Sequence, residues 1–232
     1  MDGRNFYTAS NMERERNLQI QKSESGIAEK YLKSCQTDFW QQTFRFELDC
    51  ILQRLSGGEE ILSVGCGPAI IESALIERGF RITGMDVSRE ALKHAPDDVG
   101  TVAARAEDMP FPESSFDAVI YVASLQFIEN YKKAIKETTR VLRPHGKLIV
   151  LLLNPESDFF KKKLHEPDSY VQKIIHKDLR EIEGVINERF NVHTEYKLGV
   201  KNDSIFESRD AADAILYIVT GAKKHEKEDK DA

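Results

Sequence analysis

The residues best suited to chemistry are two glycines, Gly65 and Gly67, and an aspartate, Asp86, about twenty positions later. The apolar run 61–64 precedes the glycines as a short buried strand, and apolar residues at helical spacing follow them. This order places backbone N–H groups at a helix start, where glycines leave room for a ligand. A second strand, 81–85, ends at Asp86, whose carboxylate can bind ribose hydroxyls. The pattern therefore predicts a half-fold that binds a nucleoside.

A pair of glycines alone is weak evidence, and three kinds of site compete for it. A phosphate-binding P-loop is excluded, because no Gly-Lys-Ser/Thr sequence follows. The dinucleotide fingerprint requires a small residue three positions after the second glycine, where this chain has Ile70. A third pattern has its small residue one position earlier, and Ala69 stands there.

Five segments, in order, resemble the motifs of the class I S-adenosylmethionine (SAM)-dependent methyltransferases. They are residues 61–69, 84–88, 106–111, 115–120 and 140–148. The resemblance extends over residues 26–222 and is to small single-domain enzymes such as the ubiquinone and menaquinone biosynthesis methyltransferases. It implies an α/β, Rossmann-like three-layer sandwich. Its sheet would have seven mostly parallel strands, with a C-terminal strand that is antiparallel.

The same resemblance implies that SAM is the cofactor and assigns its binding to a set of positions. These are Tyr31, Ser63, Gly65, Cys66, Gly67, Asp86, Val87, Ala106, Glu107 and Val122. The Tyr31 hydroxyl would lie near the methionine carboxylate, although the ring is equally suited to packing. The backbone of Ala106 and Glu107 would line the adenine, unless this segment is a solvent-exposed acidic loop.

Three positions depart from the family pattern. Ser63 stands where an acid usually helps to hold the methionine amine, and Ala69 replaces the third glycine. Arg105 stands where relatives often have an aspartate that binds the adenine amino group. We expect these changes to affect cofactor affinity more than the fold.

The catalytic residues are unknown at this stage. A methyl group on a sulfonium leaves readily by in-line displacement, so alignment and exclusion of water are the main requirements. An oxygen acceptor usually needs a base, for which Tyr31, Glu129 and His165 are weak candidates.

Composition limits the partners of the chain. Its 232 residues suit one α/β domain with additions, and its net charge of −6 makes nucleic acid an improbable partner. No apolar run approaches the length of a membrane helix. Cys35, Cys50 and Cys66 form no CxxC motif, which predicts a reduced, cytoplasmic location and no metal. The resemblance implies a small-molecule methyl acceptor as the partner, and the oligomeric state is not indicated.

The chain divides into three parts by sequence. Residues 1–24 read as a flexible N-terminal arm and 223–232 as a charged tail. The methyltransferase domain occupies 25–222, with N-terminal helices in 25–57 and an acceptor-side insertion in 154–177.

Three functions remain open, and a SAM-dependent methyltransferase is the leading one. The alternative is a protein of the methyltransferase fold that either binds SAM or S-adenosylhomocysteine or is degenerate, with a regulatory or assembly role. An NAD-linked oxidoreductase is the third, and both Ile70 and the predicted terminal hairpin argue against it.

Overall fold

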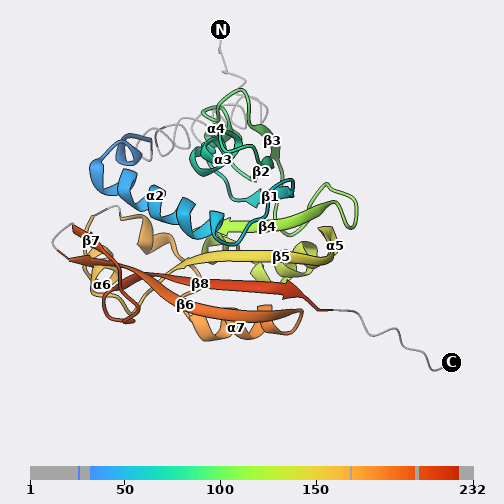
Figure 1. Ribbon diagram of the computed structural model, residues 1–232. Helices are drawn as coiled ribbons and strands as arrows, with labels where there is room; N and C mark the ends of the chain where they lie inside the picture. The colour runs from blue at the N-terminus through green and yellow to red at the C-terminus, as the bar shows by residue number, and fades with distance from the viewer. Residues whose placement is uncertain (1–25, 27–31, 168, 202–203, 225–232) are drawn as a thin grey trace, which may run out of the picture.

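One mixed sheet organises the part of the chain that the structure describes (Figure 1). A computed structural model describes residues 26, 32–167, 169–201 and 204–224. The strand order is β3-β2-β1-β4-β5-β8-β6-β7. The strands are β1 (Glu60–Val64), β2 (Arg81–Asp86), β3 (Gly100–Ala103), β4 (Phe116–Val122), β5 (Leu142–Leu153), β6 (Phe190–Lys201), β7 (Ser204–Phe206) and β8 (Ala214–Lys223).

The predicted fold class is confirmed, with one strand more than expected. Strands β1 to β5 pair in parallel, and β8 pairs antiparallel with both β5 and β6. The eighth strand, β7, pairs antiparallel with the end of β6. It has only three residues, which is too short for an alternating apolar pattern to predict a strand from the sequence.

Helices cover both faces of the sheet (Figure 1). The helices and 3₁₀ turns are α2 (Asp38–Leu52), α3 (Ile70–Ile76), α4 (Arg89–Leu92), η1 (Leu125–Phe127), α5 (Tyr131–Val141), α6 (Asp158–Leu164), η2 (Tyr170–Lys173) and α7 (Leu179–Asn187). The apolar sides of α5 and α7 pack on one face, whereas α2, α3, α6 and η2 pack on the other. Alternate residues of β4 and β5 enter the two cores, as expected for strands covered on both sides.

Local signals in the sequence set several helix starts. Ser88 accepts a hydrogen bond from the Ala91 N–H at 3.2 Å and so caps α4, as the sequence predicts. Asp178 accepts bonds from the Arg180 and Glu181 N–H groups at 3.0 Å and caps α7. The start of β5 is irregular, with a φ of 63° at His145.

The topology creates a ligand-binding edge between β1 and β4. The strand order reverses there, because β2 and β3 lie on one side of β1 while β4 and β5 lie on the other. Parallel α/β sheets bind ligands at the carboxyl ends of their strands, next to such a switch point. Among the described residues, no helix is long and apolar enough to cross a membrane. The predicted arm, 1–24, lies outside those residues, as does the tail from 225 onward.

Candidate functional site

The turn after β1 brings the backbone close to Ser124, at the end of β4. Gly65 has a φ of 75°, and its N–H donates to the Met85 carbonyl at 2.7 Å. A Cβ on Gly65 would lie 2.5 Å from Ser124 Cβ, so no larger residue fits without a shift. The Ser124 hydroxyl donates to the Val64 carbonyl at 2.6 Å, which ties the two strand ends together. The missing side chain of Gly65 is therefore a structural requirement of this turn.

Asp86 closes the glycine turn from the neighbouring strand. Its Oδ2 accepts from the Gly67 N–H and its Oδ1 from the Ser88 N–H, both at 2.8 Å. A carboxylate oxygen has more than one acceptor position, so each oxygen can accept a further bond from a ligand. Asp86 thus joins the glycine turn to the start of α4 and still presents hydrogen-bond acceptors.

Ser63 lies behind the turn and contacts a second acid. Ser63 is 1% exposed, and its hydroxyl donates to Glu72 Oε1 on α3 at 2.5 Å. Glu72 is 2% exposed, and burial raises its pKa to about 7. The strand therefore carries a buried hydroxyl whose partner is a buried carboxyl group on the neighbouring helix.

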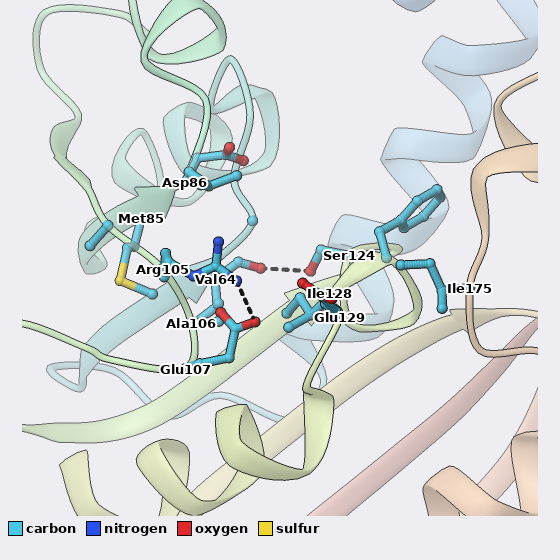
Figure 2. A pocket seen from close by; sticks show the side chains of 14 residues that line it. Val64, Met85, Asp86, Arg105, Ala106, Glu107, Ser124, Ile128, Glu129 and Ile175 are labelled. Atoms are coloured by element: carbon cyan, nitrogen blue, oxygen red, sulfur yellow. Dashed lines mark hydrogen bonds and ion pairs between the residues drawn. The ribbon is translucent and has the colours of Figure 1, made fainter.

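A cavity of about 720 Å³ opens at this edge of the sheet. That volume is in the range of pockets that bind small molecules and cofactors. Figure 2 shows side chains that line it on both sides of the β1–β4 switch point. The lining residues are Val64, Gly65, Met85, Asp86, Val87, Ala104, Arg105, Ala106, Glu107, Ser124, Phe127, Ile128, Glu129 and Ile175.

The polar residues Asp86, Arg105 and Glu107 lie on the side of β2 and β3, whereas Ser124 and Glu129 lie on the side of β4. Glu107 is 8% exposed and accepts a bond from Arg105 Nη2 at 3.0 Å, as Figure 2 shows. The Arg105 side chain is 59% exposed. The segment is therefore part of the pocket wall rather than a free acidic loop. Apolar residues such as Met85, Ala106 and Ile128 make up much of the remaining wall.

Half of the predicted cofactor residues line this pocket. They are Gly65, Asp86, Val87, Ala106 and Glu107. Four others, Ser63, Cys66, Gly67 and Val122, lie in or beside the same strand ends but are not among the lining residues. Tyr31 lies outside the described residues. Spacing along the chain could place the first group, because strand ends of a parallel sheet share one edge.

Cys66 and Gly67 belong to the turn and contact β2 instead of lining the pocket. A Cβ on Gly84 of β2 would lie 2.8 Å from Cys66 Sγ, so this glycine makes room for the thiol. Burial raises the pKa of Cys66 well above its usual value, which suits packing and not redox chemistry. The Gly67 N–H is already bonded to Asp86.

The candidate bases are placed differently. Glu129 lines the pocket, whereas His165 is exposed at the end of α6 and contacts the Lys161 carbonyl through Nδ1 at 2.8 Å. Gln126, in η1 just after β4, is fully buried. Its side-chain amide bonds the backbone of Leu153 and His176, so it connects η1 to the end of β5 and to the segment after η2.

The pocket also contains residues that spacing alone did not indicate. Ile175 follows η2 and reaches the pocket because its N–H bonds to the Gln126 carbonyl at 3.1 Å. Ile128 and Met85 add apolar surface. The only sequence signal for these residues is their proximity to a strand end or to the insertion 154–177.

Comparison with known proteins finds likeness to methyltransferases in both sequence and fold. Residues 62–150 match a family described as a methyltransferase domain. The demethylmenaquinone methyltransferase of Tropheryma whipplei (strain Twist) is 32% identical over 106 residues, 44% of each chain. The ubiquinone biosynthesis O-methyltransferase of Idiomarina loihiensis is 32% identical over 108 residues, 42% of this chain and 43% of that protein. The matched region thus covers less than half the length of each of these two curated relatives.

A solved structure from Thermotoga maritima extends the likeness over most of the chain. It is described as a SAM-dependent methyltransferase, possible histamine N-methyltransferase. The TM-score is 0.69 at 20% identity, and the match covers 86% of this chain and 98% of that one. At this identity the likeness establishes the shared fold.

Proposed function

We propose that this chain, whose residues 62–150 match a methyltransferase domain and whose fold resembles that of a SAM-dependent methyltransferase, methylates a small-molecule acceptor with SAM. The observation that carries the proposal is the meeting of Gly65, Asp86 and Ala106 at one pocket on the β1–β4 switch point. The volume of the pocket and its few polar groups suit a nucleoside cofactor.

The described residues have the chemistry that a nucleoside needs. Asp86 keeps acceptor positions for ribose hydroxyls after it has bonded Gly67 and Ser88. Met85 and Ala106 offer apolar surface to a flat base. When bound, SAM supplies a methyl group on a positively charged sulfonium.

The departures from the family pattern have local compensations. Ala69 adopts the left-handed conformation, with φ 58° and ψ 41°, that the usual glycine adopts without strain. Glu72 restores a carboxyl next to Ser63. Arg105 is held at the pocket wall by Glu107. These contacts support cofactor binding by a chain that lacks the usual acid and third glycine.

The contribution of the protein to methyl transfer is alignment and exclusion of water. Apolar residues that include Phe127, Ile128 and Ile175 wall the part of the pocket beyond Ser124. Holding the acceptor in line with the leaving methyl group can supply most of the acceleration. Glu129 is the one candidate base among the lining residues, and we assign no base to the reaction.

The acceptor is a small molecule in this proposal. The two curated relatives named above act in quinone biosynthesis by their names, which makes aromatic acceptors reasonable first substrates. The overall charge of −6 disfavours nucleic acid. A cytoplasmic location is part of the proposal and rests on the cysteine pattern.

Calorimetry with SAM and with S-adenosylhomocysteine tests cofactor binding, and a screen for released S-adenosylhomocysteine tests transfer. The acceptor pools are quinols, phenols, amines and thiols. Binding with turnover supports the enzyme. Binding with no turnover on any pool, or no binding of either nucleoside by the folded protein, favours the binding or degenerate alternative over the enzyme.

A further inference from the structure

Helix α2 carries a buried acidic side chain, Glu47. Glu47 is 4% exposed, and within the described part of the chain its carboxylate has no hydrogen bond and no ion pair. Burial alone raises its pKa from 4.5 to about 8. Buried polar groups nearly always have partners, so an unpartnered carboxyl needs an explanation.

Aromatic residues lie along the same face of the helix. Trp40 and Phe44 precede Glu47 by seven and three positions, so all three project from one side of α2. The rings of Trp40 and Phe44 are 6.1 Å apart, and Trp40 meets the Tyr170 ring of η2 edge to face at 5.6 Å. These three rings are only half-buried, whereas Glu47 is buried.

Tyr170 contributes a second buried polar group without a partner. Its hydroxyl is buried and makes no hydrogen bond with any described residue. Burial raises the pKa of this hydroxyl, and the charges of Glu47 and Glu166 raise it further. Glu47 and Tyr170 therefore affect each other electrostatically across the α2–η2 contact, and neither is neutralised by a basic side chain.

This group of residues adjoins the cofactor pocket. Phe44, Tyr170 and Phe127 pack against the same hydrophobic core, and Phe127 also lines the pocket. Ile175, two residues beyond η2, lines the pocket as well and is labelled in Figure 2. Glu47, Tyr170 and Trp40 do not themselves line the pocket, so an acceptor would have to extend past its wall at Phe127 and Ile175 to reach them.

We propose that Glu47, Tyr170 and Trp40 form the binding site for a positively charged amino group of the acceptor. This inference rests on the proposed methyltransferase function and narrows its substrate class. A carboxyl group on the same helix face as aromatic rings is suited to an ammonium ion, because a bound cation favours the ionised carboxylate and ring faces attract positive charge. A bound cation would also supply the partner that Glu47 lacks, and the Tyr170 hydroxyl can accept a hydrogen bond from it.

The experiment compares two probes that differ in charge alone. Phenethylamine is a cation at neutral pH, and phenethyl alcohol is its neutral counterpart. Binding is followed through Trp40, the single tryptophan of the chain, and by calorimetry, with and without saturating S-adenosylhomocysteine. We expect the wild-type protein to bind the amine about 10-fold or more tightly than the alcohol, and Glu47→Gln to reduce that preference to about 2-fold or less.

Three controls separate this site from general effects. Asp49→Asn removes an exposed carboxylate from the same helix and should preserve the preference. Tyr170→Phe removes only the hydroxyl and should weaken amine binding about 3- to 10-fold. Glu47→Gln should bind S-adenosylhomocysteine as the wild type does, which shows that the fold and the cofactor pocket are intact.

Each result has one meaning. Equal binding of both probes by the wild type, binding of neither at any soluble concentration, or an unchanged preference in Glu47→Gln overturns the amine site. If S-adenosylhomocysteine binds normally in those cases, the proposed methyltransferase function stands. If it does not bind but the amine preference is present and depends on Glu47, the site stands and the proposed function fails.

Discussion

The Ser63 hydroxyl donates a 2.5 Å hydrogen bond to Glu72 Oε1, and both side chains are buried. Ser63 belongs to β1 and Glu72 to the first turn of α3, so the bond joins the strand and the helix that flank the glycine turn. A carboxyl at the start of a helix is also favoured by the helix dipole. The pair therefore links the strand and the helix on either side of the glycine turn through a buried carboxyl group whose pKa is raised to about 7.

Replacing Ser63 with Ala should destabilise the fold. The substitution leaves the buried Glu72 carboxyl without this donor, which should lower the free energy of unfolding by about 1–3 kcal/mol. Urea denaturation at pH 7 measures the loss. In the double variant Ser63→Ala with Glu72→Leu, both partners are apolar and much of the loss should disappear. Equal stability of Ser63→Ala and wild type would show that the bond has no net value.

Replacing Asp86 with Ala should weaken cofactor binding. The carboxylate bonds the backbone of Gly67 and Ser88 and presents its remaining acceptor positions to the pocket. We expect S-adenosylhomocysteine affinity to fall about 10- to 100-fold, the usual value of a charged hydrogen-bond partner. Calorimetry on the folded variant checks this, with the exposed Asp97→Ala as control. Unchanged affinity would remove Asp86 from the ribose site.

Replacing Gly65 with Ala should damage both the fold and the site. The new Cβ would lie 2.5 Å from Ser124 Cβ, and the φ of 75° is unfavourable for alanine. We expect a loss of about 2–4 kcal/mol in unfolding free energy, because strain and overlap add. Gly57→Ala is the matched control, since no atom lies within 4 Å of its added Cβ. Similar midpoints of thermal unfolding for the two variants would contradict this account.

The sequence predicted those parts of the site that depend on residues close together along the chain. The spacing of Gly65 and Asp86 places them at adjacent strand ends, and the structure brings both to one pocket. It did not locate Glu72 or Glu47, because a glutamate on an amphipathic helix is normally at the surface. Their burial depends on what packs over α2 and α3, and that information lies in distant segments of the chain. The burial of Gln126 likewise depends on distant residues, since its side chain bonds the backbone of Leu153 and His176.

Stability should fall as pH rises above about 5, because of two buried acids. Burial raises the pKa of Glu47 to about 8 and that of Glu72 to about 7, from 4.5 in each case. The folded state therefore keeps protons that the unfolded chain releases above pH 4.5, so unfolding becomes easier with rising pH. The lowered pKa values of Asp117 and Glu137 act only at more acidic pH.

Glu47→Gln should remove the part of this dependence that extends furthest into the alkaline range. The glutamine has no proton to lose, so its stability advantage over the wild type should grow from pH 5 and level off above about pH 8. We expect a final difference of about 1–3 kcal/mol in the free energy of unfolding. Urea denaturation at a series of pH values measures it, with exposed Asp49→Asn as the control. A constant difference between variant and wild type across that range would mean that Glu47 titrates normally, and the case for an unpartnered buried carboxyl on α2 would fail.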